Sequence, residues 1–403
     1  MRQRWACRGL VILGRAVVLV LLVGMVVSRA LSDATPWSQW LFFVPPEAWI
    51  VLAWPAALLV AWLEGRRRRW GLARFGPMLA VLVATAYLAA THWRAGNVLL
   101  RRPGPTDLRL YHWNATETTD QALQDFLRRA DPFGLSGGSP AVVVLANPPL
   151  RLPWAEIVSM LADRPIPASR LPSHFRRGGR LVAISGLPIT DAGWTGLGLH
   201  GKTSEPDLMD HGTAMYVAVA LPDGTETTIW GWDWPSDPSL PRIAMVEPSL
   251  KALARSVHVR FTPTAAGPMR RRQQAGFPRP DLVVGDFNTG RGSAAVARLL
   301  PGMRSAHAQA GIGPDYTWPR LLYLGQHDRR TRPAIGLDQA MLRPGVWRAT
   351  AYRVLDLGVG THLAQEVILT RDRPDQAPAA QPEDRPSGPP HPADPAQATE
   401  GER

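Results

Sequence analysis

Three long apolar stretches come first in the chain. They are Leu10–Val27, which carries Arg15 as its single charged residue, Trp40–Leu63, which is interrupted by prolines and one glutamate, and Pro77–Trp93. Each has about the length, ~20 residues, that crosses a bilayer as a helix. A cleaved signal peptide is the alternative for the first stretch, but it does not account for the other two. We therefore predict that residues 1–95 are a membrane anchor of about three transmembrane helices.

Arginines are distributed unequally around these stretches. Cytoplasmic loops carry an excess of Lys and Arg, and here the N-terminus and the second connection are the richest in arginine. The distribution predicts a multi-pass protein of the cell membrane whose large remaining part is extracytoplasmic. In order, the residues are Arg2, Arg4 and Arg8 before the first stretch, Arg29 after it, Arg66–Arg69 and Arg74 after the second, and Arg94, Arg101 and Arg102 after the third.

From residue 106 to 370 the pattern changes to short apolar runs separated by turns. Leu108–Asn114 alternates apolar and polar residues, and Ala141–Leu145 and Leu282–Val284 are continuous runs typical of buried strands. Many strands with few helices favour an α+β domain of two packed sheets with outer helices. Further strands are predicted at Arg180–Ile184, Ala214–Leu221, Thr227–Trp232, His258–Phe261, Leu337–Leu342 and Glu366–Leu369, and helices at Gln121–Arg129, Pro241–Val257 and Ser293–Leu300.

Composition changes this picture in three places. Residues 371–403 are rich in Pro, Ala, Asp and Gln, which predicts a disordered tail. The formal net charge of +12 favours anionic partners, but much of the positive charge flanks the apolar stretches, so we do not interpret it as a nucleic-acid surface. Cys7 is the sole cysteine of the chain, which excludes an internal disulfide and a cysteine metal cluster.

The strongest candidate for chemistry is the segment 281–290. We expect Gly285 to stop its strand, and Asp286 and Asn288 to point the same way while Phe287 points into the core. A carboxylate binds a hard cation or orients water, and a carboxamide donates to a phosphate oxygen. The segment therefore predicts a phosphoryl-transfer site. An Asx-rich turn after a buried strand is the structural alternative.

Several other motifs follow each other in a recognisable order. They are Trp113-Asn114 at the end of the first strand, Gly285-Asp286-Phe287-Asn288, Tyr316-Thr317-Trp318-Pro319, Leu337-Asp338 and Gly360-Thr361-His362. This order resembles the endonuclease/exonuclease/phosphatase superfamily over residues 106–370. The Thr-Trp-Pro segment is similar to that of a bacterial branch with N-terminal membrane helices and an outward-facing catalytic domain. The resemblance implies an α/β (α+β) fold, a four-layer α/β/β/α sandwich of two mixed sheets, in a metal-dependent phosphodiesterase or phosphatase.

The resemblance also implies roles for five residues. It pairs Asp338 with His362 near the scissile phosphate, where a carboxylate fixes the imidazole tautomer and leaves the second nitrogen for acid–base work. Asn114 and Asn288 would donate to phosphate oxygens, and Asp286 would bind the cation or orient water. The expected partners are the membrane and a phosphoester substrate, lipid-linked by location, with nucleic acid as a second class.

Three positions depart from the family pattern. Asn147 stands where the family has a metal-binding Glu, Thr361 where it has an Asp, and Asp233 where it has a His. The metal candidates are therefore Asp286, Asn147 and Asp233, for Mg²⁺ or Mn²⁺. Three hypotheses stay open: an enzyme with a rearranged ligand set, a non-catalytic relative that binds a phosphorylated ligand or a partner protein, and a wholly structural membrane protein.

Overall fold

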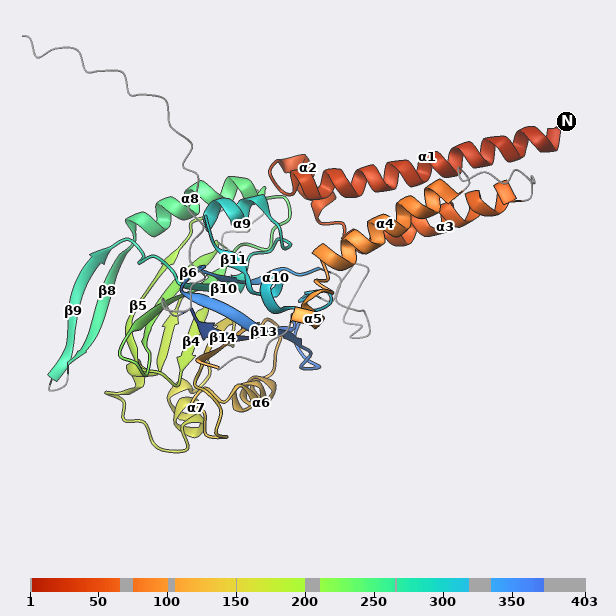
Figure 1. The fold of residues 1–403 in the computed structure, drawn as a ribbon. Coiled ribbons are helices and arrows are strands. Elements are labelled where there is room, and N and C mark those ends of the chain that lie inside the picture. The colour runs from red at the N-terminus through yellow and green to blue at the C-terminus, as the bar shows by residue number, and fades with distance from the viewer. Residues whose placement is uncertain are drawn as a thin grey trace, which may run out of the picture.

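The computed structural model describes residues 2–65, 75–100, 106–149, 151–199, 211–264, 267–318 and 335–372. A bundle of helices near the N-terminus projects from a larger domain of strands and helices (Figure 1). The bundle consists of α1 (Arg2–Leu31), α3 (Pro46–Gly65) and α4 (Gly76–Thr91), and the short helices α2 (Pro36–Phe42) and α5 (Asn97–Leu100) lie at its sandwich end (Figure 1).

The second apolar stretch is not one helix. The chain divides it into α2 and α3, so the single span predicted at Trp40–Leu63 is wrong at its start. Thr35 caps α2 by accepting from the backbone N–H of Ser38. Pro46 begins α3, a position where its missing N–H leaves no intrahelical bond unmade.

Two helices are long and apolar enough to cross a membrane. They are Trp5–Leu31 within α1, with a mean hydropathy of 2.8, and Pro46–Gly65, with 1.6. The third predicted span corresponds to α4, which has only 16 residues. One or two apolar helices near the N-terminus could therefore span a membrane, and a signal sequence would meet the same criteria.

The larger domain is built on two six-stranded sheets. Each combines a parallel pair, β1–β2 or β7–β10, with antiparallel pairs, so both sheets are mixed. The first sheet has the spatial order β13 (Trp347–Leu355), β14 (Ala364–Arg371), β1 (Leu108–Asn114), β2 (Ala141–Ala146), β4 (Leu181–Ser185), β3 (Phe175–Gly178). The second has the order β11 (Arg304–Ser305), β12 (Asp338–Leu342), β10 (Leu282–Asp286), β7 (Glu226–Asp233), β6 (Thr213–Ala220), β5 (Ile189–Gly196).

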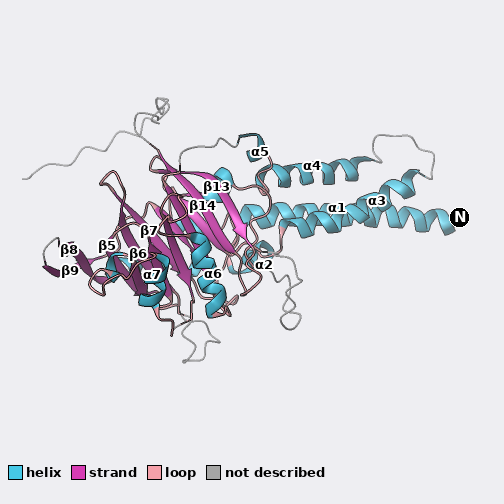
Figure 2. Cartoon of the chain, turned by 90° about the horizontal axis from the view of Figure 1, so that it is seen from below, coloured by secondary structure: helices cyan, strands magenta, loops and turns pink. Residues whose placement is uncertain are grey.

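Helices cover the outer face of each sheet and complete four layers (Figure 1), and Figure 2 shows two of them, α6 and α7, in front of the strands. The first sheet is covered by α6 (Asp120–Ala130) and α7 (Trp154–Leu161), and the second by α8 (Arg242–Arg255) and α9 (Ala294–Leu299). Separate apolar clusters fill the space between the sheets and the space under each helical layer. The predicted four-layer sandwich of two mixed sheets is confirmed. The remaining elements are the hairpin β8 (Val257–Thr264) and β9 (Gly267–Ala275), the 3₁₀ turn Leu171–Ser173, and α10 (Ala306–Ala310).

Strand β1 shows how the sequence positions the site. Leu108 and Leu110 point between the two sheets, whereas Tyr111 and Trp113 point toward α6. Because side chains alternate along a strand, His112 and Asn114 belong to the face between the sheets. Asn114 ends the strand, so its side chain lies at the rim of the sandwich core.

Strand β10 corrects one expectation about the segment 281–290. Gly285 does not stop the strand, which continues to Asp286. Glycine is required there for another reason: a Cβ atom at this position would clash with the carbonyl oxygen of Trp232 on β7. Phe287, as predicted, is fully buried. The tail predicted at 371–403 lies, from residue 373 onward, outside the described residues.

Candidate active site

Four polar side chains meet at one rim of the sandwich, where strands of both sheets end or begin. Asp286 ends β10 and Asp338 begins β12, and the antiparallel register places them opposite each other. Asn114 comes from the end of β1 in the other sheet, and His362 from the turn before β14. All four are buried, with exposed fractions between 1% and 4%.

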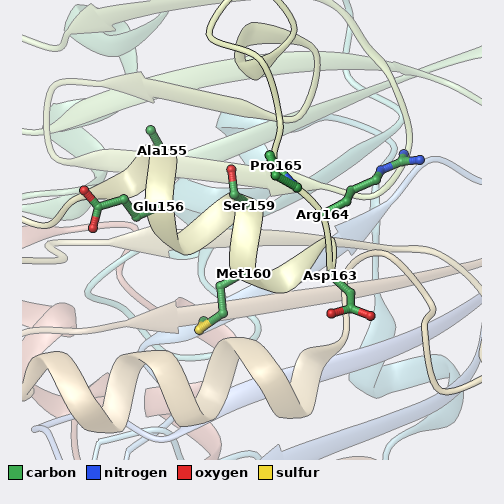
Figure 3. Close-up of a pocket in the computed structure, with 7 residues that line it drawn as sticks. All are labelled: Ala155, Glu156, Ser159, Met160, Asp163, Arg164 and Pro165. Carbon is green, nitrogen blue, oxygen red and sulfur yellow. The ribbon is translucent and has the colours of Figure 1, made fainter.

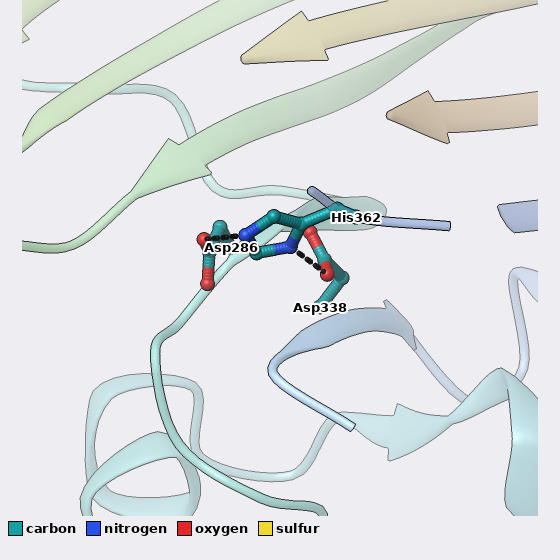
Figure 4. Close-up of side chains that lie close together, drawn as sticks. All are labelled: Asp286, Asp338 and His362. Carbon is teal, nitrogen blue, oxygen red and sulfur yellow. Dashed lines mark hydrogen bonds and ion pairs between the residues drawn. The ribbon is translucent and has the colours of Figure 1, made fainter. Parts of the chain in front are cut away.

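His362 lies between two carboxylates (Figure 4). Its Nδ1 is 2.8 Å from Oδ2 of Asp338, and its Nε2 is 3.7 Å from Oδ2 of Asp286. The first contact is a hydrogen bond that fixes the orientation of the ring, and the second is an ion pair when the ring is protonated. The structure thus brings together the Asp338–His362 pair that the sequence predicts.

A second histidine, not predicted as a site residue, completes the group. Nε2 of His112 is 3.0 Å from Oδ1 of Asp338, and Nδ1 is 3.2 Å from the carbonyl oxygen of Val144. Asp338 therefore accepts from two imidazole rings at once. The sequence alone could have indicated His112 as a site residue, because it lies two residues before Asn114 and shares its strand face.

Asn114 links the two sheets through its side-chain amide. Its Nδ2 donates to Oδ2 of Asp286 at 2.9 Å and lies 3.5 Å from Nε2 of His362. Its Oδ1 accepts from the hydroxyl of Thr116 at 2.7 Å and from Nδ2 of Asn147 at 3.2 Å. These bonds fix which end of the amide faces the carboxylate.

Burial and mutual charge shift the acidities of the group. Burial lowers the pKa of His362, but the carboxylates of Asp338 and Asp286 outweigh it and raise this pKa to about 9. Burial would raise the pKa of Asp338, but the charge of His362 and hydrogen bonds from both histidines hold it well below its usual value. Burial and the neighbouring Asp338 raise the pKa of Asp286. At neutral pH His362 is therefore an imidazolium that faces the carboxylate of Asp338.

Asn288 and Asp233 lie at the edge of this group. Nδ2 of Asn288 donates to the carbonyl oxygen of Trp234 at 2.7 Å, and its backbone N–H donates to Oδ1 of Asp286 at 2.8 Å. The buried Arg242 donates through Nε to the carbonyl oxygen of Asn288 at 2.9 Å, which fixes the loop. Asp233 is opposite Asp286 in the register of β7 and β10, and its charge contributes to the raised pKa of His362.

At Asn147 and Thr361, the two positions where the resemblance implies a carboxylate, the side chains bond to other partners. Oδ1 of Asn147 accepts from Nη1 of Arg180 at 3.4 Å, and the hydroxyl of Thr361 contacts the carbonyl oxygen of Thr116 at 3.4 Å. Arg180 was not predicted as a site residue, because its proximity depends on the pairing of β2 with β4. On this side the site gains a guanidinium where the resemblance implies a carboxylate.

A buried Asp286, Asp338 and His362 group could hold a metal ion, since ligand atoms of all three lie within 4.8 Å of one another. The donor chemistry fits the expected Mg²⁺ or Mn²⁺ poorly. Both oxygens of Asp338 are already engaged by the imidazole nitrogens of His112 and His362. On the Asn147 side, the guanidinium of Arg180 would repel a divalent cation. We therefore assign no chemical step to a metal.

The Tyr316-Thr317-Trp318 segment supports the site from outside. The hydroxyl of Thr317 accepts from the backbone N–H groups of Leu337 and Asp338, at 3.1 and 3.0 Å. The Trp318 ring packs edge-on against His362, with 4.9 Å between ring centroids. Pro319, the last residue of the predicted motif, lies outside the described part of the chain.

The helical bundle contacts the loop that follows Asp286. Asp33, fully buried in the turn after α1, accepts through Oδ2 from the hydroxyls of Thr289 (2.9 Å) and Ser293 (2.5 Å). Its Oδ1 accepts from the backbone N–H of Ala295 at 3.2 Å. The proposed anchor thus holds the loop on which Asn288 lies.

A separate hollow of about 540 Å³ lies on α7 and the turn after it (Figure 3). Its lining includes Glu156, Asp163 and Arg164, and none of the predicted site residues. It has no connection with the chemistry described above.

Comparisons with known proteins find similarity among solved structures. No family model and no curated protein matches the chain. Among solved structures, an endonuclease/exonuclease/phosphatase from Beutenbergia cavernae has 15% identity and a TM-score of 0.40, with 66% of this chain and 72% of that one covered. The human Nocturnin catalytic domain with bound sulfate has 12% identity and a TM-score of 0.39, with 66% of this chain and 94% of that one covered. A functionally unknown conserved protein from Enterococcus faecalis has 12% identity and a TM-score of 0.39, with 65% of this chain and 99% of that one covered. The fold assignment itself depends on the strand order given above.

Proposed function

We propose that this chain is a membrane-anchored hydrolase of phosphoester bonds, a phosphodiesterase or a phosphatase. The observation that carries the proposal is the Asp338–His362 pair, buried beside Asp286 and Asn114 at the rim of the two sheets. A buried imidazolium and a neighbouring amide donate to anionic oxygens, and a carboxylate with a raised pKa accepts a proton at neutral pH more readily than an ordinary one.

The distances assign different roles to His362 and Asp286. Nε2 of His362 and Oδ2 of Asp286 are 3.7 Å apart, which is close enough for one bound phosphate to contact both. We assign Asp286 to the attacking water, whose proton it accepts as the oxygen bonds to phosphorus. His362 donates a hydrogen bond to a non-bridging oxygen, while the bond to the leaving group breaks on the opposite side.

Asn147 and Arg180 extend the site beyond Asn114, because Asn147 donates to Asn114 and Arg180 donates to Asn147. Arg180 supplies a positive charge that neither Asn147 nor Thr361 contributes, and guanidinium groups bind phosphate oxygens. In this proposal arginine and imidazolium together neutralise the phosphate. The alternative of a Mg²⁺ or Mn²⁺ site at Asp286, with Asn147 and Asp233 as further ligands, predicts that chelators abolish activity.

The second candidate function is binding of a phosphorylated ligand or partner protein without turnover. The replacement of two family carboxylates by Asn147 and Thr361, both engaged in other contacts, favours it. The same donors would hold the phosphate in either case, so only a turnover measurement separates the two candidates.

The membrane anchor and its orientation are part of the proposal. Only 22% of the most apolar segment of α1 and 28% of that of α3 is buried, whereas the core helix of a soluble protein is mostly buried. The N-terminus lies at the end of the bundle away from the sandwich (Figure 1), which supports an extracytoplasmic sandwich if the N-terminus is cytoplasmic. A periplasm-active reporter fused after Leu369 should then give signal, and one fused after Arg69 should not. By location, lipid-linked phosphate is the favoured substrate class, ahead of nucleic acid.

Hydrolysis of bis-p-nitrophenyl phosphate by the purified full-length chain tests the proposal. We expect turnover that survives EDTA, and a loss of ~10²-fold or more in Asp286→Asn, because a group that acts on the attacking water is removed. Asp125→Asn, at an exposed position on α6, is the matched control. If the folded wild type shows no turnover while Asn147→Glu combined with Thr361→Asp hydrolyses the substrate with Mg²⁺, the natural protein is a non-catalytic relative.

A further inference from the structure

A cavity of about 890 Å³ lies where the helical bundle meets the second sheet. Its size is in the range of small-molecule ligand pockets, ~300–1,000 Å³. It is distinct from the active site, because none of Asp286, Asp338 and His362 lines it. Its apolar walls come from α1, α4, α9 and β12 and include Leu22, Val26, Val83, Tyr87, Val296 and Met341.

The apolar side of the cavity opens onto the outer surface of the bundle. Val26, Val83 and Tyr87 line it and are also 57–60% exposed. If α1 and α4 lie in a membrane, these side chains face acyl chains and not water. The opening is therefore accessible to a lipid from within the bilayer.

The opposite side of the cavity contains cationic side chains with unmade hydrogen bonds. Arg29, His92, Arg94 and Arg291 line it. Nε of Arg29, Nε of Arg94 and Nε2 of His92 are buried without a hydrogen-bond partner among the described residues, whereas Nη1 of Arg291 forms an ion pair with Asp315. The Arg291 side chain is only 9% exposed. Buried donors without acceptors are unfavourable, so this end of the cavity favours a ligand with several acceptor oxygens.

The arginines at this end are not equally paired. Nη1 of Arg291 lies 3.3 Å from Oδ2 of Asp315, whereas Arg94 forms no ion pair among the described residues. Burial lowers the pKa of His92, which favours its neutral ring. An anionic ligand would neutralise the guanidinium of Arg94.

We propose that this cavity binds one anionic phospholipid, with its acyl chains between α1 and α4 and its phosphate against Arg94 and Arg291. The cationic end lies where α1 and α4 end and the sandwich begins, which is the depth of lipid headgroups if the bundle spans the bilayer. Free phosphate would satisfy the cationic end alone. A phospholipid fills both parts of the cavity.

The inference rests on the membrane anchoring proposed above and not on the hydrolase activity. Carbonate extraction of the full-length chain from membranes tests the anchoring separately. Release of the chain by carbonate would overturn the lipid site together with the anchor and leave the catalytic proposal unaffected.

Native mass spectrometry of the full-length chain, transferred from nanodiscs into mild detergent, tests the site. From discs that contain dioleoylphosphatidylglycerol, the wild type should retain one lipid, and Arg94→Gln with Arg291→Gln should lower retention about tenfold or more, the effect of one lost charge-assisted hydrogen bond. Arg298→Gln removes an exposed charge from α9 outside the cavity and should retain lipid like the wild type.

Two further arms keep the test decisive. Val83→Trp narrows the apolar opening without touching the arginines, and it should also lower retention if the double variant fails to fold. Discs with dioleoylglycerol, which lacks the phosphate, should give no retained lipid. Equal retention of dioleoylglycerol, displacement of the lipid by inorganic phosphate alone, or loss of lipid in Arg298→Gln equal to that in the double variant would each overturn the proposal.

Discussion

The helical bundle and the sandwich use apolar side chains in opposite ways. In the sandwich they fill three clusters between and outside the sheets, and few large ones are exposed. In the bundle, a minority such as Ala53 and Val81 is buried between the helices, while large side chains on the outer faces, such as Ile12 and Val20, are about two-thirds exposed. Hydrophobicity alone therefore does not identify a core. The surrounding solvent decides where apolar side chains are favourable: water favours them only in the interior, whereas lipid also permits them on the outer face of a helix.

Removal of a large ring from the sandwich core should give the largest change in stability. Phe287 is fully buried and packs between the rings of Trp232 and Trp234, so Phe287→Ala should lower the free energy of unfolding by ~3–5 kcal/mol. Trp62→Ala, at a half-exposed position of α3, is the bundle counterpart and should change it far less. Chemical denaturation of the chain in detergent measures both. Equal losses would contradict the comparison.

A lysine placed on the exposed surface of each region tests the same difference between the bundle and the sandwich. Val20→Lys puts an ammonium on the exposed face of α1 and should disfavour membrane insertion by ~2.5–3.5 kcal/mol near the middle of the bilayer. Trp194→Lys, at a comparably exposed site of β5, should stay within about 0.5 kcal/mol of the wild type. The fraction of chain that resists carbonate extraction measures the membrane insertion of Val20→Lys, and a thermal melt measures the stability of Trp194→Lys. A fully extractable wild type would show that the bundle lies in water.

The raised pKa of His362 makes the stability of the sandwich depend on pH. The pKa is 6.5 in the unfolded chain and about 9 when folded, so the contribution is fully present below pH 6.5 and is lost as pH rises through 9. The difference in unfolding free energy between wild type and His362→Gln should shrink by roughly 3 kcal/mol over this window. A difference that does not vary with pH would show that the ring is neutral in the folded protein.

The contact between the two regions should have a smaller effect. Asp33 accepts three hydrogen bonds from the loop and helix after Asp286, so Asp33→Ala leaves buried donors unpaired and should destabilise the chain by ~1–3 kcal/mol. Because the same loop carries Asn288, we also expect slower phosphoester hydrolysis. Asp125→Ala, on an exposed face of α6, serves as control. Unchanged stability and turnover in Asp33→Ala would show that the bundle does not support the loop.

The bounds of a strand or helix are predicted best where a single periodic pattern of apolar residues determines them. Leu108–Asn114 has the predicted bounds, because its alternation reflects burial on one face. By contrast, β5 and β13 were not predicted, since glycine, threonine and arginine interrupt their patterns. Pro45 and Pro46 signalled the break between α2 and α3, but the length of the apolar stretch outweighed them in the prediction.

The candidate site was predicted in part for a similar reason. Asp286, Asp338 and His362 stand in motifs and were found, whereas Arg180 approaches Asn147 only through the register of β2 and β4. To predict His112 as a site residue, one would have to know that Asp338 lies opposite β1 in the other sheet. Contacts between strands far apart in sequence carry no local signal.

The pH dependence of phosphodiester hydrolysis tests the account most directly. With bis-p-nitrophenyl phosphate and the full-length chain, kcat/KM should fall as pH rises through about 9, because His362 then loses the proton that faces the phosphate. His362→Gln should be slower by ~10²- to 10⁴-fold and should lack this fall. A wild type whose rate does not decline near pH 9, or a His362→Gln variant as fast as the wild type, would contradict a catalytic Asp338–His362 pair.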